Sequence, residues 1–556
     1  MGPGPYHAGA EAHLPGPDRT APVPTDTSDQ PTPAATSPGR APGPVVDGDE
    51  RAPDRRDGLP AWLIAGVAVA GVAVRLAILL SPLGRPDSDE VIAALMVRNM
   101  GDDGFPAFFW GQHYGGTIEL APVAASLRVF GWSVGAMRVP TLVLAVLNAL
   151  LVWRIGRRWL PERQAQLAGL LVWIGPPAFV WFGVREQLFY APTMTLGLVL
   201  GLAAFRIRSD GRARDYAVAG LALGLGIWTS TNIAYFVLPA LVVAAGGGRP
   251  VRGRVREVLV GLPVAAVAAF VGAWPFIEDY LETDGAPLRI AEKFPVLGTY
   301  WSRFGSFFVE GLPGALGFRT ILTHEWIAGA AGVAAYAAVL GLLLWSLWRS
   351  APGRGRIVGW AAVGFVAYPF IYARIPFVTD DPNLRYTTFV IPFVALVLAR
   401  VVPSARAATI ALVLTLLVTT VGLVRLHAIS EGGDTGSRVG NVGDLVPVID
   451  VLRREGIDAI YGDYWVAYRI TFETEEDVIA ATSSGVPRYD PYVDHVRGSD
   501  RSAWVVDGGG QLDNLVRALD GLDVEAEVIP AGDFAVVIPE RHVGPLDVPE
   551  EARRPV

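Results

Sequence analysis

Long blocks of hydrophobic residues dominate the chain between residues 61 and 424. Each block runs to about 20 residues, which is the length that a helix needs to cross a bilayer. We therefore expect about eleven transmembrane helices, although several blocks are short. They lie near residues 61–81, 139–155, 164–181, 188–205, 215–230, 232–247, 257–275, 326–348, 357–377, 386–402 and 405–424.

The fifth and sixth blocks form one continuous apolar run, which we divide at residues 229–232. The arginine clusters between blocks justify the division, because with eleven crossings they all fall on the side of the N-terminus. Positive charge marks the cytoplasmic side, so we expect a cytoplasmic N-terminus and an extracytoplasmic C-terminal part. The clusters lie at residues 51–56, 154–158, 206–214, 249–256 and 349–356.

The two ends of the chain lack such blocks. Residues 1–60 are rich in proline and show no apolar periodicity, which predicts a disordered cytoplasmic tail. After residue 425, short strand-like runs alternate with helical patterns such as residues 445–454. This alternation predicts a small α/β domain over residues 425–556. Its expected strands lie at residues 459–461, 478–481, 503–506, 525–530 and 534–538.

Composition agrees with an α-helical polytopic membrane protein. Of the 556 residues, 51% are hydrophobic and 18% are charged, whereas a soluble domain carries about 25% charge. The chain has no cysteine, which excludes a disulfide scaffold, a cysteine-ligated metal and thiol catalysis. Its net charge of −8 gives no indication of a nucleic-acid partner.

Two expected external segments, residues 82–138 and 276–325, are longer than simple connections between helices need to be. Long loops on a helical bundle commonly carry function. Both segments are rich in aromatic residues, which suits either amphipathic helices at the bilayer surface or an interfacial aromatic belt.

Three acids, Asp87, Asp89 and Glu90, stand at the start of a helix expected over residues 89–100. Asp87 suits the N-cap position, and Glu90 three residues later could complete a capping-box-like pair. Helix capping leaves Asp89 unexplained. A carboxylate at the membrane surface can serve as the general base for an acceptor hydroxyl.

Further motifs accompany these acids. Val97-Arg98 and Gly101-Asp102 follow Asp89-Glu90 in the first external segment, and Arg385-Tyr386 precedes a proline within a late apolar block. With these motifs and its helix pattern over residues 61–424, the chain resembles the GT-C glycosyltransferases of the protein O-mannosyltransferase type, which include bacterial aminoarabinose transferases. The Lys-Pro dipeptide of the aminoarabinose branch is replaced here by Tyr114-Gly-Gly-Thr, so the sugar stays open.

The resemblance implies a transferase that moves a sugar from a polyprenyl-phosphate-linked donor to an acceptor hydroxyl at the outer face of the plasma membrane, with inversion. The acceptor would be a glycan, a lipid or a protein. By the same resemblance Asp89 is the general base, and Glu90 and Asp102 orient or support it.

The expected substrate-binding residues divide between the phosphate and the sugar. Arginine suits a lipid phosphate, because its fork binds two phosphate oxygens. Arg385 is the first candidate, followed by Arg138, for which snorkelling is an equal alternative, and by Lys293. Asp87 is a further substrate-binding candidate. The residues that could line the sugar site are His113, Tyr114 and Tyr386, and for each of them an interfacial role is an equal alternative.

Alternative interpretations remain at this stage. A transporter or flippase of lipid-linked glycans is less favoured, because we find no internal repeat and the acids lie in an external segment. We expect no tightly bound cofactor or metal, although the acids could hold a divalent cation. Arg185 and Glu186 are interpreted as a surface ion pair. The aromatic segment at residues 461–465 either selects the acceptor or packs in a core.

Overall fold

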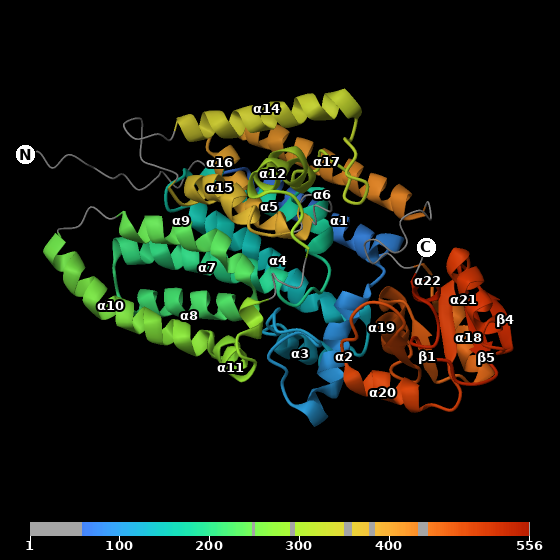
Figure 1. Ribbon diagram of the computed structural model, residues 1–556. Helices are drawn as coiled ribbons and strands as arrows, with labels where there is room; N and C mark the ends of the chain where they lie inside the picture. The colour runs from blue at the N-terminus through green and yellow to red at the C-terminus, as the bar shows by residue number, and fades with distance from the viewer. Residues whose placement is uncertain are drawn as a thin grey trace, which may run out of the picture. The chain divides into compact units, whose positions relative to one another are not determined.

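A computed structural model describes residues 58–246, 251–289, 295–349, 359–376, 378, 384–431 and 443–554. The expected tail lies outside the described residues except for residues 58–60. Helices make up almost all of the described chain before residue 443 (Figure 1). In its first half they are α1 (Ala61–Leu79), α2 (Ser88–Asp103), α3 (Leu120–Phe130), α4 (Val134–Gly156), α5 (Glu162–Ile174), α6 (Pro177–Phe182), α7 (Tyr190–Ser209), α8 (Ala213–Thr229) and α9 (Ala234–Ala245).

The second half of the bundle contains both long helices and short turns. Its helices are α10 (Val251–Gly272), α11 (Trp274–Glu282), α12 (Tyr300–Ser306), α13 (Leu312–Ala315), α14 (Gly329–Trp348), α15 (Gly359–Tyr372), α16 (Ile391–Ala399) and α17 (Ala405–Glu431). The short turns are η1 (Pro82–Gly84), η2 (Thr231–Ile233), η3 (Ala286–Leu288), the π-helical η5 (Phe307–Gly311), η6 (Leu384–Tyr386) and η7 (Thr388–Val390).

Five helices in the described part of the chain are individually long and apolar enough to cross a membrane, namely α1, α4, α7, α14 and α17. Helices α10 and α11 pass the same test as a pair that is bent by 61°. Shorter apolar helices occupy other expected spans, so each of the eleven expected positions holds helical structure. The chain is a multi-pass membrane protein, and the number of eleven crossings stays a prediction.

The structure confirms a break between the fifth and sixth expected spans. Helix α8 ends at Thr229, and Ser230 adopts an extended conformation with φ −166°. The Ser230 hydroxyl accepts a hydrogen bond from the Asn232 N–H at 3.3 Å, which caps η2 before α9 begins. A polar residue that binds its own backbone offers the chain an alternative to continuing the helix.

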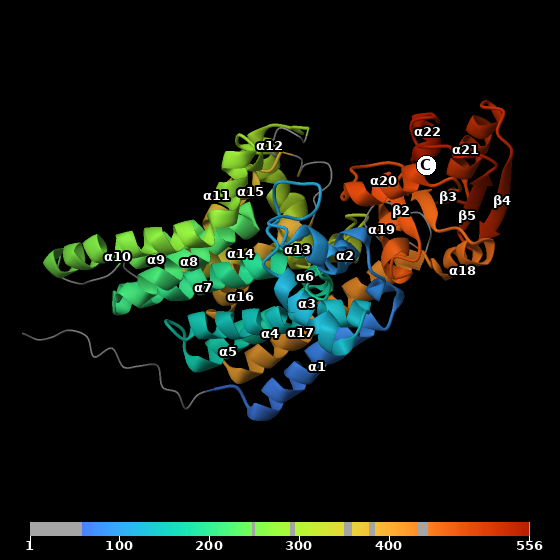
Figure 2. The ribbon, with the colours of Figure 1, turned by 90° about the horizontal axis from the view of Figure 1, so that it is seen from below.

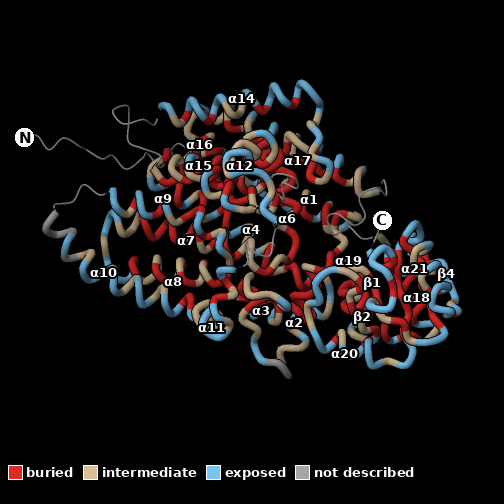
Figure 3. Tube along the Cα trace, viewed as in Figure 1, coloured by how far each residue is buried: buried red, intermediate tan, exposed pale blue. Residues whose placement is uncertain are grey.

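Helix α7 is the most enclosed of the five long helices. In its most apolar stretch 61% of the residues are buried, against at most 33% in the other four. The bundle interior beside α7 is rich in buried aromatic side chains. Gly197 leaves room for one of them, because a Cβ at this position would lie 2.2 Å from the Phe236 ring. Much of α10 and α14 is exposed or only partly buried (Figure 3), and their exposed apolar residues include Phe270 and Trp345. Lipid is the solvent that suits these residues.

The last part of the chain forms a five-stranded sheet. Its strand order is β2-β1-β3-β5-β4; β1 pairs in parallel with β2 and β3, whereas β5 pairs antiparallel with β3 and β4. The strands are β1 (Ala459–Gly462), β2 (Ile479–Thr482), β3 (Ala503–Asp507), β4 (Ala526–Ala531) and β5 (Phe534–Pro539). Each lies within two residues of its expected position.

Helices cover both faces of this sheet. Alternate strand residues face opposite layers, as the two-residue period of a strand requires. Ile460 and Val505 pack with α18 and α19, whereas Tyr461 and Trp504 pack with α21. Figure 2 shows α18 and α21 on opposite sides of the strands. The helices are α18 (Val446–Glu455), α19 (Tyr464–Glu473), α20 (Asp490–Gly498), α21 (Gly510–Asp520) and α22 (Glu550–Arg553). We call residues 443–554 the α/β region.

Helices α8 and α10 approach so closely that glycine is required between them. A Cβ on Gly224 would lie 2.1 Å from the Ala269 carbonyl oxygen, and backbone atoms cannot move aside as a side chain can. We expect Gly224→Ala to lower the free energy of unfolding by about 1–3 kcal/mol, because the helices must separate. Thermal unfolding of the purified protein in detergent measures this.

The matched control is Gly66→Ala in α1, where an added Cβ would have no neighbour within 4 Å. Equal melting temperatures for the two variants would contradict the packing of α8 on α10.

Candidate functional site

The first turn of α2 holds three acids in different environments. Asp87 is the N-cap, as expected, and its Oδ1 accepts a hydrogen bond from the Glu90 N–H at 2.9 Å. Successive helical residues point about 100° apart, so Asp89 and Glu90 face different sides of α2. Glu90 points into the protein and is fully buried, whereas a quarter of the Asp89 side chain is exposed.

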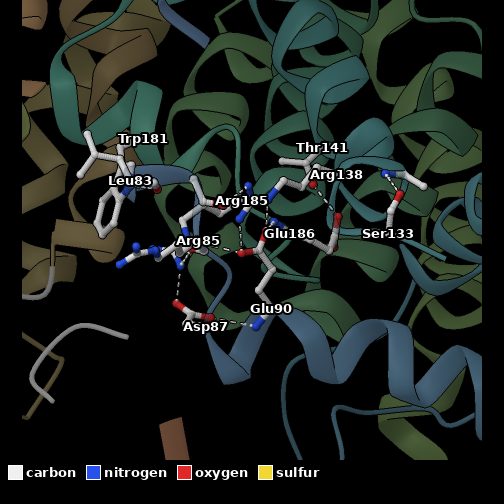
Figure 4. A network of polar contacts seen from close by, with 12 residues as sticks. Leu83, Arg85, Asp87, Glu90, Ser133, Arg138, Thr141, Trp181, Arg185 and Glu186 are labelled. Atoms are coloured by element: carbon white, nitrogen blue, oxygen red, sulfur yellow. Dashed lines mark hydrogen bonds and ion pairs between the residues drawn. The ribbon is translucent and has the colours of Figure 1, made fainter. Parts of the chain in front are cut away.

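Glu90 forms a two-armed ion pair with Arg138 of α4 (Figure 4). Arg138 Nε and Nη2 donate to the two carboxylate oxygens at 2.5 and 2.6 Å, and Nη1 donates to the Gly84 carbonyl at 2.8 Å. Burial alone would raise the pKa of Glu90, but Arg138 and Arg185 outweigh it and hold the pKa below its usual value. Glu90 is therefore a charged link between α2 and α4, and its side chain does not complete a capping box.

Arg185 joins this network from the segment after α6. Its Nη2 lies 3.1 Å from Asp87 Oδ2, and its Nε lies 3.6 Å from Glu90 Oε2. Its guanidinium stacks over the Trp181 ring. Burial raises the pKa of Asp87 to about 6, against the opposing charge of Arg185. The interpretation of Arg185 and Glu186 as a surface ion pair is wrong, because both are buried and each bonds other residues.

Two further carboxyl groups, Glu119 and Glu186, share one hydroxyl behind Glu90. Thr141 Oγ1 lies 3.2 Å from Glu119 Oε1 and 2.5 Å from Glu186 Oε2. Burial raises the pKa of Glu119 well above its usual value and that of Glu186 to about 8. This pair therefore holds a proton at neutral pH. The Glu186 N–H donates to Glu90 Oε1 at 2.8 Å, so the pair also supports Glu90.

Asp89 meets residues that are far away in the sequence. Its Oδ2 lies 3.3 Å from Arg385 Nη1 of η6, so the structure brings together the expected base and the expected phosphate-binding arginine. Its Oδ1 accepts a hydrogen bond from the Tyr464 hydroxyl at 2.6 Å. Sequence reasoning placed Tyr464 in a segment of interest but did not connect it with Asp89. No sequence signal joins positions 375 residues apart.

A cavity of about 450 Å³ is lined by Tyr386, the residue after Arg385, although Asp89 and Arg385 themselves do not line it. Tyr114 and Tyr386, the two expected sugar-site tyrosines, both line it, together with Tyr190, Asn232 and Arg374. Burial raises the pKa of Tyr114, whose electrostatic neighbours include Asp89, Arg385, Tyr386 and Arg488. Such a wall offers aromatic faces and hydrogen-bonding groups, which suits a sugar attached to a lipid.

A second, smaller cavity of about 50 Å³ lies between arginines. Arg75 of α1, Arg185 and Arg385 line it with Asn148 and Gln187. Three guanidinium groups on one small cavity favour an anion there.

Of the remaining expected residues, the structure describes only the side chain of His113. His113 Nδ1 lies 3.0 Å from Asp279 Oδ1 and 3.1 Å from Oδ2, so it ties the segment between α2 and α3 to α11. The side chain of Asp102 and all of Lys293 lie outside what the structure describes.

Comparisons with known proteins find partial matches in sequence. A family model described as dolichyl-phosphate-mannose-protein mannosyltransferase matches residues 122–276. The undecaprenyl phosphate-α-4-amino-4-deoxy-L-arabinose arabinosyl transferase of Edwardsiella ictaluri is 24% identical over 262 residues. That match spans 45% of this chain and 44% of the relative, which is less than half of its length.

Solved structures extend the likeness to most of the chain. The crystal structure of ArnT from Cupriavidus metallidurans bound to undecaprenyl phosphate superposes with a TM-score of 0.55, at 13% identity, over 88% of this chain and 99% of that chain. A weaker likeness, with a TM-score of 0.49 at 12% identity, is to the apo oligosaccharyltransferase of Archaeoglobus fulgidus, over 82% of this chain and 71% of that chain.

The helical bundle thus has the fold of the GT-C glycosyltransferases, as expected from the sequence. The family-model match over residues 122–276 and the arabinosyl transferase relative support the same superfamily of membrane glycosyltransferases.

The pair of buried carboxyl groups makes stability depend on pH. The pKa of Glu186 is raised in the folded protein, so folding retains a proton that the unfolded chain releases above its ordinary pKa of about 4.3. Between that value and about 8, the free energy of unfolding falls as pH rises, by at most about 1.4 kcal/mol per pH unit. We expect Glu186→Gln to make this decline shallower, measured as melting temperature from about pH 5 to about pH 8.

Glu278→Gln is the matched control, because Glu278 is an exposed glutamate of α11. A Glu186→Gln protein whose stability declines as steeply as that of the wild type would show that Glu186 is not buried in its neutral form.

Proposed function

We propose that this protein transfers a sugar from a polyprenyl-phosphate-linked donor to an acceptor hydroxyl at the outer face of the plasma membrane. The observation that carries the proposal is the pairing of Asp89 with Arg385, whose chain neighbour Tyr386 lines a cavity together with Tyr114. The same bundle in ArnT is known in complex with undecaprenyl phosphate, and this supports a lipid phosphate as the leaving group.

In the proposed reaction, the donor phosphate binds Arg385 and displaces Asp89 Oδ2 from it. The carboxylate then accepts the proton of the acceptor hydroxyl, whose oxygen attacks the anomeric carbon of the sugar. The bond between that carbon and the phosphate oxygen breaks, and the negative charge on the departing lipid phosphate is stabilised by Arg385. A single displacement of this kind inverts the anomeric configuration.

The remaining acids support Asp89 in this scheme. Glu90 and Asp87 hold the first turn of α2 through Arg138 and Arg185. Because these two carboxylates are already engaged by arginines, the proposal includes no tightly bound metal. A divalent cation brought by the substrate phosphate stays compatible with it.

The membrane orientation belongs to the proposal as well. We place the N-terminus and the arginine clusters in the cytoplasm, and the first external segment and the α/β region outside, with about eleven crossings. The sugar and the acceptor, whether glycan, lipid or protein, are left to experiment.

The central test is Asp89→Asn. The purified protein in lipid is offered polyprenyl phosphates carrying mannose, glucose, galactose or aminoarabinose, with a membrane extract as acceptor. We expect the wild type to transfer one of these sugars, and kcat to fall by about 10²–10⁴ in the variant, because the amide cannot accept the proton.

Glu90→Gln separates support from catalysis. It leaves Arg138 buried without its charged partner, so we expect a loss of about 3–5 kcal/mol in stability. Asp89→Asn should unfold like the wild type. Transfer that survives in Asp89→Asn would remove Asp89 from the role of base. Movement of a lipid-linked glycan across the bilayer, without transfer, would favour the flippase alternative.

A second test concerns Arg385. Replacement by lysine keeps the charge but removes the two-armed fork that suits a phosphate. We expect the donor KM to rise about tenfold or more in Arg385→Lys, since hydrogen bonds to charged groups contribute about 1.5–3 kcal/mol. Steady-state kinetics with varied donor measure this. Arg406→Lys, at an exposed position in α17, should leave the donor KM unchanged; equal KM values in both variants would remove Arg385 from the donor site.

A further inference from the structure

The α/β region supplies side chains to the site itself. We propose that Tyr464 and Arg488 are positioning residues of the reaction: Tyr464 holds Asp89 in the orientation that turnover needs, and Arg488 holds Tyr464. This inference rests on the proposed function, in which Asp89 is the base. It gives the α/β region a part in turnover, beyond any selection of the acceptor.

The fold aims Tyr464 at Asp89. Helix α19 begins directly after Asp463, whose Oδ1 caps it by accepting the Trp465 N–H at 2.9 Å. Ser484 donates to the other oxygen of Asp463 at 3.1 Å and fixes the cap. Tyr464 is thereby the first residue of a capped helix that follows β1, and its hydroxyl lies 2.6 Å from Asp89 Oδ1. The tyrosine is more than nine-tenths buried, so its ring has little freedom to turn away.

Arg488 determines the direction of this hydrogen bond. Its Nε donates to the Tyr464 hydroxyl oxygen at 3.1 Å, and a guanidinium can only donate. The single hydroxyl hydrogen of Tyr464 is therefore directed to Asp89. Arg488 is itself held, because Nη1 donates to Gln112 Oε1 at 2.9 Å and its backbone N–H donates to the Tyr468 hydroxyl at 2.6 Å. The result is a directed chain from Arg488 through Tyr464 to Asp89.

Several further contacts seat the α/β region on α2. The Ser88 hydroxyl donates to the Tyr464 carbonyl at 2.6 Å, and Asn99 Nδ2 donates to Glu476 Oε1 at 2.8 Å. Trp110 stacks on Tyr489 with ring centroids 4.0 Å apart. Residues of α2 and α19 share one buried apolar cluster, and the two helices lie side by side in both ribbon views (Figures 1 and 2). The contact with Asp89 is thus part of an extended interface.

The two carboxylate oxygens of Asp89 contact different parts of the chain, one the α/β region and the other the helical bundle. Tyr464 engages Oδ1, which leaves Oδ2 toward Arg385 and, in the proposed reaction, toward the acceptor proton. Without the tyrosine hydroxyl the carboxylate can rotate about its own side-chain bonds, and fewer molecules present the base in the productive orientation. Binding of the donor at Arg385 does not depend on this hydroxyl.

The test is Tyr464→Phe, which removes only the hydroxyl. We expect kcat to fall about tenfold or more while the donor KM stays within about twofold, the pattern of a contact that matters for turnover and not for donor binding. Arg488→Gln should change kcat in the same direction. Wild-type kcat in Tyr464→Phe would overturn the inference.

Tyr492→Phe is the matched control. Its hydroxyl also bridges α2 and the α/β region, since it contacts Asn99 and Glu476, but it does not touch Asp89. A merely structural role of Tyr464 would lower kcat equally in both variants, and that result would overturn the proposal. Absence of transfer by the wild type from every donor would instead contradict the proposed function.

Crosslinking tests the seating of the α/β region without these variants. The chain has no cysteine, so two cysteines introduced at positions 98 and 475 would be the only thiols that a reagent could modify. The side chains of Arg98 and Glu475 lie 3.6 Å apart and are partly exposed. We expect a short bifunctional thiol reagent to join Arg98→Cys and Glu475→Cys in membranes, with kcat retained. Failure to crosslink, or a crosslinked protein that no longer turns over, would overturn the inference.

Discussion

The ion pair between Glu90 and Arg138 is the contact on which the site depends. Both side chains are almost completely buried, and a buried charge that loses its partner costs several kcal/mol. The pair therefore fixes α2 against α4 with little tolerance for movement. Since Asp89 is the neighbouring residue in the same helical turn, its position follows from this anchor. Asp89 can be partly exposed and still keep its position, because the ion pair with Arg138 holds the neighbouring Glu90.

The charges around this anchor balance one another. Asp87 and Glu90 face Arg138 and Arg185, and Asp89 faces Arg385, so each group of acids has an equal number of guanidinium partners. Burial instead raises the pKa of Glu119 and Glu186, so that this pair holds a proton at neutral pH. Ion pairing and protonation thus both reduce the cost of burying several ionisable groups close together beside the apolar bundle.

The sequence predicted those features that local pattern determines. Hydrophobic blocks predicted the helix positions, short strand-like runs between helical patterns predicted all five strands, and the acid before α2 predicted the N-cap at Asp87. The motifs at Asp89 and Arg385 identified two residues that the structure brings into contact. Tertiary contacts were beyond reach: the burial of Arg185 and Glu186, and the meeting of Tyr464 with Asp89, depend on how distant segments pack. Glu90 shows the limit best, because its spacing from Asp87 suits a capping box while its side chain bonds Arg138.

The hydrogen bond between Asp89 and Tyr464 also has a consequence for biosynthesis. The two residues are separated by 375 positions, so most of the protein must be synthesised before the contact can form. Closing so long a loop is slow and follows the local folding of the individual helices. A nascent or prematurely terminated chain that has inserted its first helices therefore has the acid but not its tyrosine partner. Docking of the α/β region on α2 is in this sense the last step in assembling the site.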